Sequence, residues 1–249
     1  MKVEPFAVAI RGMVLRGNVH WPEQRPSGCV ICSHGLFSSK ESPKFIRMAD
    51  DLARGGLVSL RYDHRGCGSS QGRIEDTTVS GRLEDLAAVL NFARQSLSMG
   101  HSLGLMGSSM GGFISLLAAA RDDRIAGLCA WATPFLIKDR RNAPQAEEYP
   151  LLGDGFYRDL AAHPLSEILP RVRGCLLLHG ETDELVPVWH ARNNYDLLNE
   201  PKDIHLFEGG DHRFTNDRHR SEAMGLTVGW LKKRLGRTAP SGEIRTGKK

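Results

Sequence analysis

The sequence has no long hydrophobic stretch. None of its apolar runs approaches the ~20 residues that a membrane-spanning helix requires. The first six residues, Met-Lys-Val-Glu-Pro-Phe, also lack the hydrophobic region of a secretory signal peptide. We therefore expect no membrane span and no signal peptide, and we expect the protein to be cytoplasmic.

A strong excess of positive charge is also missing. Lysine and arginine number 33 against 29 aspartates and glutamates, and part of the formal net charge of +4 lies at Arg245, Lys248 and Lys249. No basic stripe is interleaved with aromatic residues, the pattern that is typical of nucleic-acid binding. We therefore expect no nucleic-acid partner. The oligomeric state stays open, a homodimer included.

Cysteine is scarce and odd in number. Five residues are typical of reduced thiols and not of a disulfide framework. Cys29 and Cys32 are spaced as C-x-x-C, but they lie in a strand-like segment, where residues three apart point to opposite faces. We interpret both as buried apolar residues. No metal is expected either, because the acidic and histidine residues between 211 and 219 lack a metal-ligand spacing, and no cofactor is predicted.

The composition is that of an ordinary globular protein, with 41% hydrophobic and 25% charged residues among 249. Strand-like segments occupy residues 2–10, 12–20, 29–33, 57–62, 103–106, 125–132, 174–178 and 203–207. Helical patterns run from Pro43 to Gly55, with Ser42 as the expected cap, and then over 79–96, 110–120, 188–198 and 217–235. This alternation predicts an α/β fold: a mostly parallel eight-stranded sheet with helices on both faces.

One interval interrupts the alternation. Residues 134–169 are irregular and contain four prolines, and an interval of this length is usually functional. We expect a lid insertion at 134–169 within a single domain that spans residues 1–235. The polar residues 236–249 are expected to form a disordered tail.

The most informative pattern is G-x-S-x-G, at Gly107-Ser108-Ser109-Met110-Gly111. A short apolar segment precedes it and a helical pattern follows it, so the chain must turn sharply at Ser109. The glycines leave room for this turn, because a Cβ at either position would collide with neighbouring backbone. Such a turn exposes the serine hydroxyl and aims the Met110 N–H at the same point, as expected of a nucleophile.

A serine nucleophile needs a base that takes its proton, and the base needs a carboxylate that orients it. Asp183 follows the expected strand 174–178, and His212 follows strand 203–207. The chain order Ser, Asp, His is the one expected when the nucleophile lies at such a turn. We predict Ser109 as nucleophile, His212 as general base and acid, and Asp183 as orienting group. The alternatives are His205 and His219 for the base, and Glu181 and Glu184 for the carboxylate.

The negatively charged oxygen of a tetrahedral intermediate needs two N–H donors. The Met110 N–H is the first. The second is expected from the loop after strand 29–33, which begins His34-Gly35. The Leu36 N–H is the preferred candidate, and the Phe37 N–H is the next.

Together these motifs resemble those of the α/β-hydrolase superfamily. The matching segments are His34-Gly35, residues 63–69 (Asp-His-Arg-Gly-Cys-Gly-Ser), residues 107–111, Asp183 with Val186-Pro187, and Asp211-His212. The chain is most similar to the serine-aminopeptidase-like group, which includes monoacylglycerol-lipase-like enzymes and bacterial cinnamoyl (feruloyl) esterases. The resemblance implies an α/β-hydrolase fold with a short lid. It also implies hydrolysis of a small-molecule carboxylic ester through an acyl-enzyme, without a cofactor.

The sequence does not define the ester. Phe37, His64 and Phe135 are the candidate substrate-binding residues. A cinnamoyl-type acyl group is the first hypothesis, and a short-chain acylglycerol or a thioester is the next. An aminopeptidase activity at the same site would need an acidic pair, for which Glu147 and Glu148 are the only candidates. A non-catalytic ligand-binding protein on a hydrolase scaffold is the alternative from another class, and the intact catalytic pattern argues against it.

Overall fold

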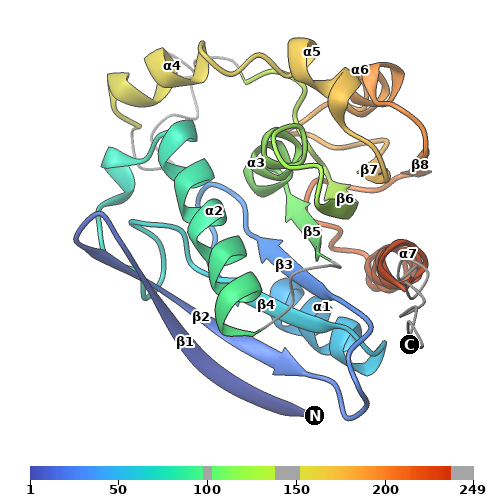
Figure 1. The fold of residues 1–249 in the computed structure, drawn as a ribbon. Helices are drawn as coiled ribbons and strands as arrows, with labels where there is room; N and C mark the ends of the chain where they lie inside the picture. Colours follow the sequence, from blue (N-terminus) through green and yellow to red (C-terminus); the bar gives the residue numbers. More distant parts are fainter. Residues whose placement is uncertain (98–102, 138–151, 237–249) are drawn as a thin grey trace, which may run out of the picture.

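A computed structural model describes residues 1–97, 103–137 and 152–236 (Figure 1). Its central sheet has eight strands in the order β1-β2-β4-β3-β5-β6-β7-β8. β2 pairs antiparallel with β1 and with β4, and all other neighbours are parallel. The predicted mostly parallel eight-stranded sheet is therefore confirmed. The strands are β1 Lys2–Ile10, β2 Met13–Trp21, β3 Cys29–Ser33, β4 Val58–Tyr62, β5 Leu103–Ser108, β6 Ile125–Trp131, β7 Cys175–Gly180 and β8 Lys202–Phe207.

Helices cover both faces of this sheet (Figure 1). Residues of α1 and α7 share one apolar core with the sheet, and residues of α2 and α3 share the core on the opposite face. The helices are α1 Pro43–Arg54, α2 Val79–Ser96, α3 Met110–Ala119, α4 Asp154–Leu160, α5 Leu165–Ile168, α6 Trp189–Leu197 and α7 Asp217–Leu235, with short 3₁₀ turns η1 Ile74–Asp76 and η3 Leu169–Arg171.

The side chains of β3 illustrate this two-faced burial. Cys29 and Ile31 belong to the core under α2 and α3, whereas Val30 and Cys32 belong to the core under α1 and α7. The two cysteines therefore point to opposite faces, as predicted. Burial in apolar surroundings raises the pKa of both thiols.

The start of α1 differs from the prediction in one respect. Ser42 occupies the position before the helix, but its side chain makes no capping hydrogen bond. Its carbonyl oxygen instead accepts the N–H groups of Phe45 and Ile46, at 2.8 and 3.1 Å. Pro43 follows as the first helical residue, where its missing N–H costs nothing.

The interval predicted as a lid lies partly outside the described residues, because the described chain stops at 137 and resumes at 152. The later part forms α4 and α5. Asp159 of α4 accepts hydrogen bonds from the N–H and the hydroxyl of Ser80 on α2, both at 2.7 Å. A lid function for residues 134–169 stays a prediction. The predicted tail also lies outside the description beyond residue 236.

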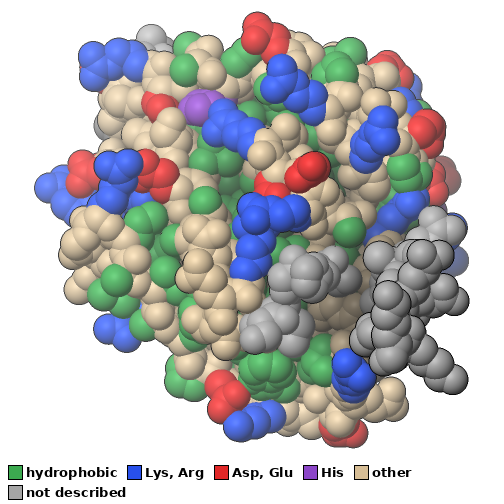
Figure 2. All heavy atoms as spheres, in the orientation of Figure 1, with side chains coloured by type: hydrophobic (Ala, Val, Ile, Leu, Met, Phe, Trp, Pro, Cys, Tyr) green, Lys and Arg blue, Asp and Glu red, His purple; other side chains and the backbone are tan. Residues whose placement is uncertain are grey.

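The face seen in Figure 2 carries positive and negative side chains in alternation, without a large patch of one sign. Charges of opposite sign also pair: Asp122 contacts both Arg94 and Arg124. No helix within the described ranges is long and apolar enough to cross a membrane.

Candidate active site

Ser109 lies at the sharp turn between β5 and α3. Its backbone angles, φ +53° and ψ −120°, belong to a region that non-glycine residues rarely adopt and that carries strain. The Ser109 N–H donates to the Trp131 carbonyl on β6 at 2.8 Å, which holds the turn in place. The side chain is partly exposed although its neighbours are buried. The turn therefore lifts the hydroxyl out of the core.

Two glycines of the motif are required by the lack of space around this turn. A Cβ on Gly111 would lie 2.0 Å from the Ser33 carbonyl oxygen, and a Cβ on Gly107 would lie 2.3 Å from the Gly111 carbonyl oxygen. The predicted reason for both glycines is thus confirmed. α3 begins at Met110, so the Met110 N–H has no acceptor one turn earlier in the helix and lies at the positive end of the helix dipole.

Asp183 and His212 are hydrogen-bonded to each other although 28 residues separate them in the chain. The His212 Nδ1 lies 2.8 Å from Asp183 Oδ2. Asp183 Oδ1 accepts the N–H groups of Leu185 and Val186 at 2.9 and 2.7 Å. The carboxylate is buried and the imidazole is partly buried. Because Nδ1 donates to the carboxylate, Nε2 is the ring nitrogen left to accept a proton.

The loops after β7 and β8 bring this pair together. The Thr182 N–H and hydroxyl both donate to the Gly210 carbonyl, at 3.0 and 2.9 Å. The Cα of Gly180 is so close to Gly210 that a Cβ there would lie 2.2 Å from the Gly210 oxygen. β5, β7 and β8 run in the same direction. Ser109, Asp183 and His212 each follow the carboxyl end of one of these strands, so all three lie on the same side of the sheet.

Two of the alternative acid and base residues, Glu184 and His205, have other partners, as does His179. Glu184 Oε2 accepts the backbone N–H of His212 at 3.2 Å, so it contacts the loop of the histidine and not its ring. His205 is partly buried on β8, and its ring pairs with Glu222 at 3.5 Å. His179 lies 2.7 Å from the Val186 carbonyl and 3.4 Å from Asp183.

The loop after β3 lies beside the Ser109 turn. A Cβ built on Gly35 would be 3.7 Å from the Ser109 Cβ. The Gly35 carbonyl accepts the Nδ1–H of His34 at 2.7 Å, and the Leu36 carbonyl accepts a hydrogen bond from Arg82 at 2.9 Å. Within the described part of the chain, the Leu36 N–H donates to no acceptor. Leu36 therefore offers a donor next to Ser109.

His64 is not at the surface, and its predicted contact with a substrate is wrong. Its exposed fraction is 0%. Its Nε2 lies 2.9 Å from the Ser33 hydroxyl and 3.1 Å from the Tyr62 hydroxyl, and its Nδ1 lies 3.3 Å from Asp85. Burial and the nearby Arg82 cation lower the pKa of His64 to about 4. His64 belongs to a buried polar network behind the loop.

Phe37 and Phe135, the other predicted substrate contacts, follow β3 and β6. Phe37 is 40% exposed, as is Leu136, whereas Phe135 is partly buried. The sheet order places β3 and β6 on either side of β5. These apolar side chains therefore follow the two strands that flank the Ser109 strand. Glu147 and Glu148, the pair needed for a peptidase, lie outside the described residues.

Lys44 of α1 is a charged neighbour that the sequence analysis did not predict. Its Nζ donates to the Ser108 hydroxyl at 2.8 Å and lies 5.9 Å from the centre of the Trp131 ring. Burial and the cations of Arg213 and Arg220 lower the pKa of Lys44 to about 8. Nothing in the sequence around Lys44 distinguishes it from an ordinary helix lysine.

Arg82 is the second unpredicted residue at the site. It lies on the buried side of α2 together with Val79 and Leu86, and its exposed fraction is 0%. Its Nη2 holds the Leu36 carbonyl, as described above. A charged residue at helical spacing among apolar ones was the available indication in the sequence.

Comparison with known proteins supports the fold described above. A family model described as the alpha/beta hydrolase fold matches residues 28–174. YqkD, an uncharacterized protein of Bacillus subtilis, is 28% identical over 227 residues, which cover 84% of this chain and 72% of that protein. The mitochondrial palmitoyl-protein thioesterase ABHD10 of Mus musculus is 26% identical over 212 residues, which cover 74% of this chain and 68% of the relative.

Solved structures show the same architecture over nearly the whole chain. Est1E from Butyrivibrio proteoclasticus, with ferulic acid bound, aligns with a TM-score of 0.82 at 21% sequence identity, covering 93% of this chain and 100% of Est1E. The family match alone spans more than half of the chain. The chain therefore belongs to the α/β-hydrolase fold family.

Proposed function

We propose that this protein is a serine hydrolase that cleaves carboxylic esters through an acyl-enzyme. Ser109 is the nucleophile, His212 the general base and acid, and Asp183 the group that orients His212. The Asp183–His212 hydrogen bond of 2.8 Å supports this proposal most directly. It lies at the carboxyl ends of the strands, where the strained Ser109 turn also lies. It favours the tautomer in which Nε2 can take the serine proton.

The proposed reaction has two stages. In acylation, Ser109 Oγ attacks the carbonyl carbon while its proton passes to His212 Nε2, and the carbonyl oxygen becomes an oxyanion that faces the Met110 and Leu36 N–H groups. The intermediate then collapses, and the alcohol leaves with the proton from His212. In deacylation, His212 takes a proton from water, the resulting hydroxide attacks the acyl carbon, and Ser109 leaves with that proton as the acid is released.

For the acyl group we propose an apolar chain or ring, with a cinnamoyl-type group first. The exposed Phe37 and Leu136 and the partly buried Phe135 support an apolar acyl pocket, because they follow the strands on either side of β5. Est1E, a structural relative, has ferulic acid bound. The similarity to the palmitoyl-protein thioesterase ABHD10 favours a fatty acyl thioester as the second candidate.

A substrate panel tests the proposal. Wild type and Ser109→Ala are assayed with p-nitrophenyl esters of increasing acyl length, methyl hydroxycinnamates and a palmitoyl thioester. We expect Ser109→Ala to lower kcat by ~10⁴–10⁶, because the nucleophile and base act as a unit. Ser221→Ala is the matched control, since within the described part of the chain its hydroxyl contacts only Arg47, on the surface. Its kcat should equal that of wild type.

A fluorophosphonate probe supplies an independent measurement. Wild type should be labelled at Ser109, and Ser109→Ala should not be labelled. Undiminished hydrolysis by Ser109→Ala would refute the proposed nucleophile. A wild type that neither reacts with the probe nor cleaves any member of the panel would favour the non-catalytic binding protein.

A further inference from the structure

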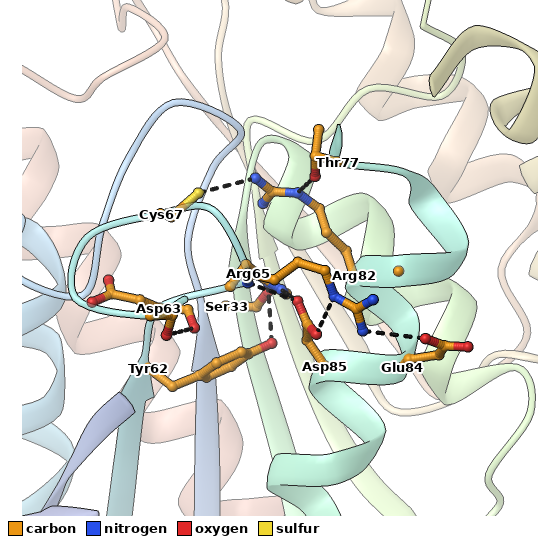
Figure 3. Close-up of polar contacts among 12 residues, drawn as sticks. Ser33, Tyr62, Asp63, Arg65, Cys67, Thr77, Arg82, Glu84 and Asp85 are labelled. Carbon is orange, nitrogen blue, oxygen red and sulfur yellow. Dashed lines mark hydrogen bonds and ion pairs between the residues drawn. The ribbon is translucent and has the colours of Figure 1, made fainter. Parts of the chain in front are cut away.

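Arg82 is a buried cation without a carboxylate partner. Its Nε donates to the Thr77 hydroxyl at 3.1 Å, and its Nη2 lies 3.4 Å from the Cys67 sulfur as well as 2.9 Å from the Leu36 oxygen. Figure 3 shows the guanidinium turned toward Cys67 and Thr77. Among the described residues no acidic group lies within ion-pair distance of it, and its Nη1 is buried without a partner.

The nearest buried acid has other partners. Asp85, one turn along α2, accepts from Arg65 Nε at 2.7 Å and lies 3.3 Å from His64. Figure 3 shows Arg65, and not Arg82, reaching toward Asp85 and Glu84. Neutralising an acid is therefore not the role of Arg82. Burying a cation is unfavourable unless its hydrogen bonds compensate, and an apolar side chain of similar volume would fill the same space without that cost.

The hydrogen bond to Leu36 indicates what the guanidinium does. In a trans peptide the carbonyl and the following N–H point in opposite directions. His34 holds the Gly35 carbonyl, which sets the direction of the Leu36 N–H, and Arg82 holds the Leu36 carbonyl, which sets the direction of the Phe37 N–H. Both peptide planes that flank Leu36 are thus fixed from the protein interior. The bond from Arg82 is charge-assisted, so it is also the stronger kind.

We propose that Arg82 is a positioning residue for the oxyanion donor Leu36: by holding the Leu36 carbonyl, its buried guanidinium fixes the peptide plane that follows Leu36 and keeps the Leu36 N–H facing the oxygen above Ser109. This inference depends on the proposed hydrolase function. Donors stabilise an oxyanion only when they are held in place before charge develops, because reorienting them during the reaction costs free energy. A side chain without a donor at position 82, such as methionine, would leave the Leu36 carbonyl without this hydrogen bond.

The alternative is that Arg82 only stabilises the fold through Thr77 and Cys67. The two roles differ in how the rate depends on the carbonyl oxygen of the substrate. An oxyanion accepts hydrogen bonds strongly, whereas the larger sulfur anion formed from a thionoester (C=S in place of C=O) accepts them weakly. The ratio of kcat/KM for an ester to that for its matched thionoester therefore measures how much the N–H donors stabilise the oxyanion. General destabilisation lowers both rates together.

The experiment compares Arg82→Met with Arg65→Met. Removing one oxyanion donor outright costs ~10²–10³ in kcat, so loss of its orientation should lower ester kcat about 10- to 100-fold, with KM within about twofold of wild type. The ester-to-thionoester ratio should fall by a similar factor. Arg65→Met removes a neighbouring, partly buried cation that contacts Asp85 and Glu84 and not Leu36. Its ratio should stay at the wild-type value, whatever happens to its melting temperature.

Two further variants cover the case in which Arg82→Met does not fold. Arg82→Gln keeps a neutral donor for the Leu36 carbonyl, and Arg82→Lys keeps the charge but loses the fork of donors. Both should show a ratio below that of wild type. An unchanged ratio in every folded variant, with activity that still requires Ser109, would overturn the positioning role and leave the proposed function intact. Activity that survives Ser109→Ala would instead reject the proposed function itself.

Discussion

Ser109 adopts a positive φ, a backbone conformation that residues with a side chain rarely adopt. The strain at φ +53° persists because β5 and α3 are both packed and the Ser109 N–H is tied to Trp131. Strained backbone of this kind is often found where a reactive group must be exposed in a fixed direction. At this position, stability and exposure of the hydroxyl oppose each other.

A pair of variants measures this strain. Both Ser109→Gly and Ser109→Ala remove the hydroxyl, but glycine adopts positive φ without a steric cost. We expect Ser109→Gly to be more stable than Ser109→Ala by about 1 kcal/mol in denaturant unfolding. Ser115, in the helical interior of α3, is the control, and there alanine should be the more stable by about 1 kcal/mol. Alanine more stable at both positions would show that Ser109 is not strained.

At the scale of elements, α3 approaches the sheet closely enough to exclude side chains. The helix contains Gly111 and Gly112, and a Cβ on Gly112 would lie 1.9 Å from the Thr133 hydroxyl and 3.0 Å from the Thr133 Cβ. These contacts let the Ser109 turn lie directly over the ends of β3, β5 and β6. The position of the nucleophile therefore depends on how closely one helix packs.

Two alanine substitutions test this packing. Gly112→Ala should lower the free energy of unfolding by about 1–3 kcal/mol, because the added methyl group overpacks the contact with Thr133. The methyl group of Gly225→Ala in α7 would meet no atom within 4 Å. The better helix propensity of alanine should therefore raise the free energy of unfolding by about 1 kcal/mol. Urea unfolding measures both. Stabilisation at both positions would mean that α3 can move away from the sheet without cost.

At the scale of the whole molecule, the fold holds several histidines in the neutral state. Burial lowers the pKa of His34, His64 and His179 below the ordinary value of 6.5, and that of His64 falls to about 4. His64 faces the cations of Arg82 and Arg65 and the carboxylate of Asp85. Between pH 6.5 and 4 the unfolded chain therefore binds more protons than the folded protein, and stability falls as the pH is lowered through this range.

Replacing His64 by glutamine tests this dependence. Each proton taken up only on unfolding changes the free energy of unfolding by about 1.4 kcal/mol per pH unit. In urea unfolding, the free energy of unfolding of His64→Gln should decline less steeply between pH 6.5 and 4.5, by up to that amount per pH unit. His205→Gln, at a site on β8 that is only partly buried, is the control and should follow the wild-type slope. A His64→Gln slope equal to that of wild type would contradict the account.

Local patterns in the sequence were enough for much of the fold. Alternation on β3 already assigned Cys29 and Cys32 to opposite faces, because the side-chain period of a strand is set by its own backbone. The glycines of the Ser109 turn were likewise predictable, since the clash that requires them lies within the strand–turn–helix unit and its neighbouring strand. Ser42 occupies the predicted cap position, and the one difference there is equally local: its carbonyl oxygen, and not its side chain, accepts the first helical N–H groups.

Contacts between distant segments decided the rest. The order of motifs predicted Asp183 and His212 as partners, but their hydrogen bond depends on Thr182 and Gly210 joining two loops. Nothing local indicated whether His64 points outward or into the core, because a loop residue can do either. Arg82 could not be assigned because Leu36, Cys67 and Thr77 converge on it from three separate segments. Periodicity and steric exclusion act between near neighbours and can be read from the chain, whereas the partner of a buried charge is chosen only when the segments pack.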